Sequence, residues 1–252
     1  MAGKSRRGAA GRPPEQWTRN DIVGEGFRRW QLDRPFGPVN DYYAAALGQE
    51  RSPLARAATV ARFTGSVAIF DDGCGTGRTL KTFVDAVRNE PGCEQTEISG
   101  TGLNWRDYSD QSLDPQTRHA FANGDLEYIV ADAEDMAGVW DSLTPGTQDV
   151  VIAHHAIRYS RRPGLWLAGM MQVAKTGGWL FCNMPDDDPM VLPDSEFTRQ
   201  LDDWRESGID VVQQRYRRDN VYPTDVPPDI SLQSIAGLPY RYYTVQKPFG
   251  YA

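Results

Sequence analysis

The chain has 252 residues, of which 40% are hydrophobic and 24% charged, and its formal net charge is -7. This composition is typical of a folded globular protein rather than a disordered chain, and no apolar run reaches the ~18 residues that would span a bilayer. The first twenty residues carry five basic side chains and one acid, a balance of +4, so the remainder carries -11. An acidic body argues against a broad phosphate-binding surface.

The cysteines and the N-terminus indicate a cytoplasmic protein. Cys74, Cys93 and Cys182 form no CxxC pair and no even framework, which predicts reduced thiols in a reducing compartment. The charged N-terminus has no apolar segment after it, so we expect no secretory signal. Residues 1–18 are rich in Gly, Ala, Arg and Pro without a hydrophobic period, which predicts a disordered basic tail.

Three helices are expected before residue 66, each with its own end signals. They cover residues 20–34, which a proline terminates, 39–47, which Gly48 closes, and 53–64, which Ser52 caps and Gly65 ends. After residue 66 the pattern changes to short apolar runs that alternate with helices. Strands are expected at 67–70, 98–103, 127–130, 149–153 and 179–182, with helices at 79–87 and 165–174, the second closed by Gly177-Gly178. This alternation predicts a mostly parallel sheet with right-handed crossovers.

The last third of the chain is less regular. A helix is expected at 195–207, strands at 211–216 and 242–245, and a long proline-rich loop at 219–239 that is a candidate lid. We predict one domain over residues 19–252. It divides into a helical extension or lid (19–65), a ligand-binding core (66–185) and an acceptor-side region with the C-terminal strands (186–252).

The most informative segment is Asp71-Asp72-Gly73-Cys74-Gly75-Thr76-Gly77, between a predicted strand and a predicted helix. Alternate glycines let the backbone turn sharply and approach a ligand, and the helix that follows presents free N–H groups. Ligands of doubly wound sheets bind in this crevice. A nicotinamide fingerprint does not fit, because its third glycine would fall on Arg78 or Leu80, and a P-loop lacks its Gly-Lys-Ser/Thr. An acid before the first glycine suits a cationic or amine-bearing ligand.

This loop resembles the [D/E]-x-G-x-G-x-G signature of the class I S-adenosylmethionine-dependent methyltransferases, and the resemblance covers roughly residues 40–185. It implies an α/β fold: a Rossmann-like, doubly wound, mostly parallel seven-stranded sheet with helices on both faces and an N-terminal helical extension. In that family the loop wraps the methionine part of the cofactor and the acid holds its amino group. The resemblance assigns this cofactor-binding role to Asp71, Gly73, Cys74, Gly75 and Gly77.

Two further strand ends match the family's cofactor site. The second strand ends at Asn104, where the family has an acid on the ribose hydroxyls, and an amide still hydrogen-bonds hydroxyls without charge assistance. The long spacing between Asp71 and Asn104 leaves two options, a loop inserted at 88–96 or a misplaced second strand. Trp105 is placed to stack on adenine. The third strand ends at Asp132-Ala133, and the resemblance gives Asp132 the adenine amino group and Ala133 a backbone contact, an acidic surface turn being the alternative.

The fourth strand ends at His154 and His155, which are the candidate catalytic residues. Methyl transfer is an in-line displacement, so the protein must position the acceptor and take the proton of a hydroxyl, for which an imidazole is suited. Adjacent strand residues face opposite ways, so we expect one of them in the pocket, and the alternative is that both are structural. His154 and Tyr43 are also assigned to the cofactor side. Tyr42, Trp140, Tyr159 and Trp166 are acceptor-pocket candidates with core packing as the alternative.

The leading hypothesis is a small-molecule methyltransferase of secondary metabolism that acts on a hydroxyl of a natural product, with S-adenosylmethionine as cofactor. Partners other than the small-molecule acceptor are not expected, neither nucleic acid nor membrane, and a homodimer is one assembly that the sequence allows. Asp186-Asp187-Asp188 suggests a metal, but such a run is usually solvated and none is expected. An RNA or protein methyltransferase, which the basic tail favours, and a related fold with non-methylating chemistry, which Asn104 leaves open, are the alternatives.

Overall fold

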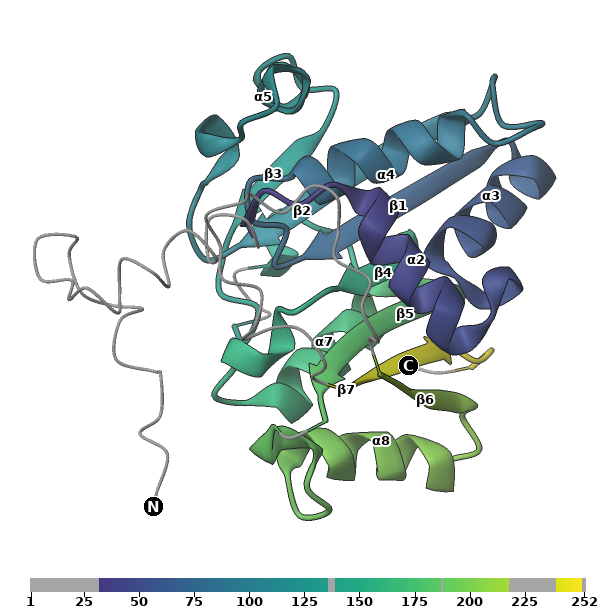
Figure 1. Cartoon of the computed structure of the whole chain (residues 1–252), viewed down its shortest axis with the longest axis vertical. Helices are drawn as coiled ribbons and strands as arrows, with labels where there is room; N and C mark the ends of the chain where they lie inside the picture. Colours follow the sequence, from purple (N-terminus) through teal and green to yellow (C-terminus); the bar gives the residue numbers. More distant parts are fainter. Residues whose placement is uncertain (1–31, 136–138, 187, 218–238, 251–252) are drawn as a thin grey trace, which may run out of the picture.

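A seven-stranded sheet in the order β3-β2-β1-β4-β5-β7-β6 forms the centre of the protein. The computed structural model describes residues 32–135, 139–186, 188–217 and 239–250 (Figure 1). The strands are β1 (Ser66–Asp72), β2 (Glu97–Asn104), β3 (Glu127–Val130), β4 (Gln148–Ala153), β5 (Ala174–Pro185), β6 (Val211–Arg217) and β7 (Pro239–Gln246). The strands β1 to β5 pair in parallel, and β7 pairs antiparallel with both β5 and β6. The predicted fold class is confirmed.

Helices cover both faces of this sheet (Figure 1). They are α2 (Phe36–Leu47), α3 (Pro53–Thr64), α4 (Arg78–Arg88), α5 (Pro115–Ala122), α7 (Pro163–Val173) and α8 (Glu196–Glu206). Short 3-10 turns lie at Gln49–Arg51, Ser109–Gln111, Ile157–Tyr159 and Pro189–Val191. Among the described ranges, no helix is long and apolar enough to cross a membrane.

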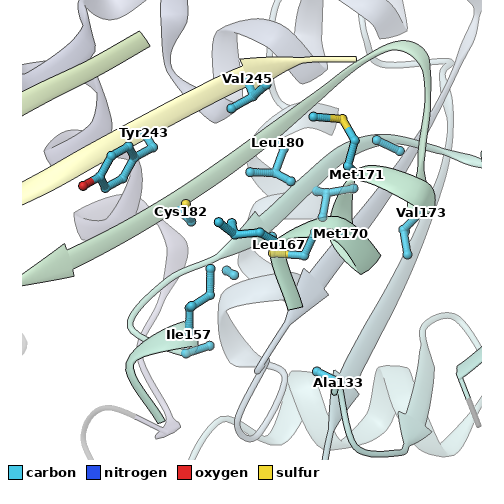
Figure 2. Close-up of a cluster of buried hydrophobic side chains, with 14 of the residues drawn as sticks. Ala133, Ile157, Leu167, Met170, Met171, Val173, Leu180, Cys182, Tyr243 and Val245 are labelled. Carbon is cyan, nitrogen blue, oxygen red and sulfur yellow. The ribbon is translucent and has the colours of Figure 1, made fainter. Parts of the chain in front are cut away.

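The core divides into two clusters, one on each face of the sheet. One cluster joins α2, α3 and α4 to the sheet, and the other joins α7 and α8 to it. Figure 2 shows part of the second cluster, in which side chains of α7 meet those of β5 and β7: Leu167, Met170, Met171, Leu180, Cys182, Tyr243 and Val245. All six residues of β4 are buried, as expected of a central parallel strand. Cys74, Cys93 and Cys182 are free and buried.

Local signals explain where the helices begin and end. In α3 the Ser52 side chain accepts from the Ala55 N–H, Pro53 occupies the first position, and Gly65 ends the helix in the left-handed region at φ 74°. In α4 the buried residues Leu80, Phe83, Val84 and Val87 share one face, at the spacing of an α-helix.

Two expectations about the elements are decided by the structure. The second strand lies where it was expected, so the long spacing is a loop between α4 and β2. The prediction that Gly177-Gly178 closes a helix is wrong, because β5 begins at Ala174 directly after α7 and the glycines lie within it. A Cβ on Gly178 would lie 2.9–3.1 Å from three backbone oxygens, at an irregularity in the β4–β5 register. Glycine here serves close strand packing.

The helix α5 was not predicted. It starts from Asp114, whose side chain accepts from the N–H groups of Gln116 and Thr117, and from a proline at the first position. It buries only Thr117 and Ala120, so its sequence lacks the hydrophobic stripe that would predict a helix. The predicted tail, most of the helix expected at 20–34 and nearly all of the loop expected at 219–239 lie outside the described residues.

Candidate active site

The glycine loop connects β1 to α4 through three left-handed glycines. Gly73, Gly75 and Gly77 have φ values of 79°, 59° and 82°, so each adopts a backbone that side-chain-bearing residues rarely adopt. The N–H groups of Gly73 and Cys74 both donate to the carbonyl oxygen of Leu103 in β2, at 2.8 and 3.1 Å. The sharp turn that the glycines predicted is therefore present.

The glycines also allow close packing, but against protein rather than open space. A Cβ on Gly73 would lie 2.3 Å from Cβ of Ala156, and one on Gly75 would lie 2.3 Å from the carbonyl oxygen of Leu32. A Cβ on Gly77 would lie 2.2 Å from the ring of Phe121. The loop is thus in contact with three separate parts of the chain, and its shape depends on all of them.

Two buried carboxylates, Asp71 and Asp72, stand at the head of this loop with 3% and 4% of their surface exposed. Burial, together with the neighbouring Asp72, raises the pKa of Asp71 to about 8. Burial also raises the pKa of Asp72 to about 7. The indole N–H of Trp166, which donates to Oδ2 of Asp72, has the opposite and smaller effect on this pKa. Among the described residues, Oδ2 of Asp71 and Oδ1 of Asp72 have no hydrogen-bond partner.

Such a pair is unfavourable unless a positively charged group joins it. S-Adenosylmethionine carries an ammonium and a sulfonium, so the unsatisfied carboxylate oxygens fit this cofactor. Asp72 was missed as a site residue, because the family signature leaves its position open. The adjacent pair of acids at the end of an apolar strand was the available signal.

The ends of β2 and β3 lie side by side beyond the glycine loop, with Asn104 paired to Val130 in the register. The buried Asn104 accepts the N–H of Trp105 on its Oδ1 at 2.9 Å. The side-chain oxygen of Asn104 is thus used in the turn, and its side-chain NH2 group remains as a donor for a hydroxyl. Trp105 is 54% exposed, which suits a stacking surface. Asp132 is exposed and Ala133 is buried, so the two predicted adenine contacts lie at this same edge.

His154 and His155 lie beyond the last residue of β4, with ring centroids 4.2 Å apart. The alternation of strand side chains therefore does not separate them, contrary to expectation. His155 has φ 60°, which makes it the sole non-glycine residue with positive φ in the described ranges. Its N–H donates to Oδ1 of Asn183 in β5 at 2.8 Å. The left-handed conformation of His155, held by the buried side chain of Asn183, thus places both imidazoles at the carboxyl end of β4.

The two histidines have different neighbours. Nη1 of Arg34 donates to Nε2 of His154 at 2.8 Å, and since a guanidinium cannot accept, this nitrogen is the unprotonated one. The ring of His154 also packs against Tyr43, with centroids 5.7 Å apart. The ring of His155 instead meets Tyr240 edge-on, with centroids 4.9 Å apart. Arg34, Asn183 and Tyr240 were not foreseen, because no local pattern connects them to the histidines.

The predicted aromatic residues divide between core and surface. Tyr43 is fully buried and packs edge-on against Phe181 and Tyr242, so it lies in the core beneath the site, and its contact with the cofactor stays a prediction. Trp140 packs against the core, while Tyr159 is 67% exposed. Trp166 reaches the site through its bond to Asp72.

The acidic run after β5 is paired with arginines where it is described. Asp186 accepts from Arg241 and lies 2.6 Å from Arg215, while Asp188 caps the turn at Met190 and lies 3.9 Å from Arg158. Asp187 lies outside the described residues. No group of metal-ligating side chains occurs within the ranges that the structure covers.

The comparison with protein families finds a related kind of domain. Residues 70–182 match the model of a methyltransferase domain. Over this segment, which is a little under half of the chain, the sequence is similar to methyltransferase domains. The matched segment runs from the last residues of β1, through the glycine loop, to the middle of β5. A search among curated proteins finds none that matches.

Solved structures of low sequence identity share the fold. A Listeria monocytogenes protein assigned as a class I S-adenosylmethionine-dependent methyltransferase is 13% identical, with a TM-score of 0.54 over 94% of this chain and 71% of that one. A Galdieria sulphuraria protein assigned as a sarcosine dimethylglycine methyltransferase is 13% identical, with a TM-score of 0.53 over 90% and 98%. The Burkholderia thailandensis 1,6-didemethyltoxoflavin N1-methyltransferase, solved with 1,6-didemethyltoxoflavin and S-adenosylhomocysteine, is 14% identical, with a TM-score of 0.50 over 91% and 86%.

Proposed function

We propose that this methyltransferase domain transfers the methyl group of S-adenosylmethionine to a hydroxyl of a small natural-product molecule. The observation that carries the proposal is the buried carboxylate pair at the head of the glycine loop. Asp71 and Asp72 are almost fully enclosed, their pKa values are raised by burial, and each keeps one oxygen without a hydrogen-bond partner among the described residues. A cationic cofactor satisfies both groups at once.

The residues around this pair divide the cofactor among them. Asp71 would hold the amino group, Asn104 the ribose hydroxyls, and Asp132 the adenine amino group beside Ala133 and Trp105. The cofactor supplies a methyl group on an already activated sulfonium. The protein then needs only to align an acceptor in line and accept its proton.

His155 is the better candidate for the general base of the two histidines. Nε2 of His154 already accepts from Arg34, so that nitrogen takes a proton only after the contact breaks. His155 is held in an uncommon backbone conformation by Asn183, and residues with such conformations concentrate at active sites. The role of His154 is then to hold, through its bond to Arg34, the segment that precedes α2.

A small-molecule acceptor is supported by two observations of different kinds. The body of the chain is acidic, which disfavours an RNA backbone as acceptor. The Burkholderia neighbour is a 1,6-didemethyltoxoflavin N1-methyltransferase, solved with 1,6-didemethyltoxoflavin bound. Secondary metabolism is the context in which we expect the acceptor.

Methyl transfer is tested by incubating the protein with S-adenosylmethionine labelled in its methyl group. Hydroxylated small molecules, tRNA and a protein lysate are offered in parallel, and Asp71→Asn serves as the inactive control. We expect label in the small-molecule fraction, lost in His155→Asn and retained in part in His154→Asn. Label in RNA or protein would identify the alternative acceptor class. Cofactor binding without label in any fraction would indicate a non-methylating activity.

A further inference from the structure

The residues just before α2 cross the glycine loop and form part of its surroundings. The N–H of Thr76 donates to the carbonyl oxygen of Leu32 at 2.8 Å, and the Thr76 hydroxyl lies 3.1 Å from the same oxygen. Any side chain on Gly75 would collide with this backbone. The segment is held further along as well, because Oγ1 of Thr79 donates to the carbonyl oxygen of Arg34 at 2.7 Å.

Asp33 lies at the centre of these contacts. It is 5% exposed, and its Oδ1 accepts from the hydroxyls of Thr76 and Ser112, both at 2.6 Å. Its Oδ2 accepts from the N–H of Leu113 at 3.1 Å and lies 3.6 Å from Nη1 of Arg78. One carboxylate thus joins the glycine loop, the first residue of α4 and the loop after β2.

Asp33 differs in this respect from the carboxylates at the end of β1. Both oxygens of Asp33 have donors from the protein itself, whereas Asp71 and Asp72 each keep one oxygen without a partner in the described part of the chain. A buried carboxylate with a full set of donors stabilises one arrangement of the groups around it, and losing it leaves those donors unsatisfied. The groups that Asp33 holds are those that shape the glycine loop.

We propose that Asp33 is a positioning residue for the cofactor, acting through Thr76 on the glycine loop. The inference rests on the proposed function, because the loop is taken as the cofactor's binding site. A loop with three left-handed glycines has much conformational freedom to lose, and a ligand binds more tightly when the protein has already restricted that freedom. Asp33 supplies this restriction from a segment that lies outside the matched family region.

The test measures the affinity for S-adenosylhomocysteine by calorimetry and the free energy of unfolding for each variant. Asp33→Ala should weaken binding about tenfold, and Thr76→Val should weaken it by a similar factor. Because both changes break one connection, the double variant should bind little worse than either single one. Asp33→Asn keeps an oxygen for the two hydroxyls and should retain an intermediate affinity.

Asp149→Asn is the matched control. Asp149 is also a buried carboxylate with two donors, Ala68 N–H at 2.8 Å and Lys175 Nζ at 2.7 Å. It lies near the start of the central strand β4, however, at the end of the strands opposite the glycine loop. This variant should lose stability and keep its affinity within about twofold. If Asp33→Ala does not fold, Thr76→Val and Asp33→Asn decide the question.

Affinities of the Asp33 and Thr76 variants within twofold of the control, or independent additive losses, would overturn the positioning role while the proposed function stands. A wild-type protein that does not bind S-adenosylhomocysteine would overturn both together.

Discussion

The candidate site lies where the parallel strands of the sheet end, and its two halves are built in different ways. On the half formed by β1, β2 and β3, the residues expected to contact the cofactor follow directly from strand ends, and unsatisfied carboxylates are concentrated there, while Asp33 supports the glycine loop from a distant segment. On the half formed by β4, β5 and β7, the polar groups come from distant parts of the chain, as in the contact of Arg34 with His154.

The difference concerns charge as well as sequence distance. The acids of the second half are paired, as Asp186 is with Arg241, whereas Asp71 and Asp72 are adjacent acids that form no ion pair with a basic side chain among the described residues. The first half is therefore suited to a cation, and the second half to an acceptor held by aromatic and imidazole groups. Variants that change one half should leave the other intact.

The largest effect is expected from Asp71→Asn. Removing the charge that faces the cofactor should weaken binding of S-adenosylhomocysteine about 30-fold or more, since a buried charge partner contributes roughly 2–5 kcal/mol. The cofactor-free variant should be more stable than wild type by about 1 to 4 kcal/mol near pH 8. The pKa of Asp71 is raised from 3.8 to about 8, so its burial lowers stability as pH rises through that window, and the gain should vanish near pH 4.

Calorimetry and urea unfolding at several pH values check both effects. A variant that binds normally, or one that is less stable than wild type at pH 8, would contradict the assignment of Asp71 as an unsatisfied carboxylate.

A smaller effect on stability is expected from Gly77→Ala, with Gly65→Ala as its control. Both glycines are left-handed, with φ values of 82° and 74°, so both variants carry backbone strain of about 1 kcal/mol. Only Gly77 would place its new methyl 2.2 Å from the Phe121 ring, whereas Gly65 faces open space. Gly77→Ala should therefore lose about 1–3 kcal/mol more than Gly65→Ala, as measured by urea unfolding. Equal losses would mean that the loop does not need this close contact.

The smallest effect is expected from Arg34→Met on the acceptor half. With only three histidines, a long-range proton–nitrogen spectrum resolves each imidazole, and wild-type His154 should carry its proton on Nδ1. Arg34→Met should change the signals of His154 and leave His119 unchanged, with a stability loss of about 1 kcal/mol. A protonated Nε2 in the wild-type protein would show that the contact with Arg34 is not formed.

The same division explains what the sequence could predict. The mostly parallel sheet, the glycine loop and the roles expected of Asp71, Asn104 and Asp132 rest on contiguous motifs and regular alternation. Asp33, Asn183 and Tyr240 reach the site only after folding, and nothing near them in the sequence indicates a ligand. The helix α5 escaped prediction because it is stabilised by its cap and buries almost no apolar surface.

The turn after β4 shows a further limit. The alternation of side chains along a strand predicted that His154 and His155 would point in opposite directions. The strand ends at Ala153, however, and with His155 in the left-handed conformation the two rings lie close together. A positive φ at a residue other than glycine is set by tertiary contacts, here the bond to Asn183, and is not readable from local propensity.

Titration of the wild-type protein with S-adenosylmethionine at pH 6 and pH 8 tests whether the buried carboxylates at the head of the glycine loop bind a cationic cofactor. A cation prefers the ionised carboxylate pair, and the pKa of Asp71 is raised to about 8, so binding must release a proton at low pH. We expect binding at one site, with an affinity about tenfold or more higher at pH 8 than at pH 6 and with measurable proton release at pH 6. No binding at either pH, or an affinity that stays constant or falls between them, would contradict this expectation.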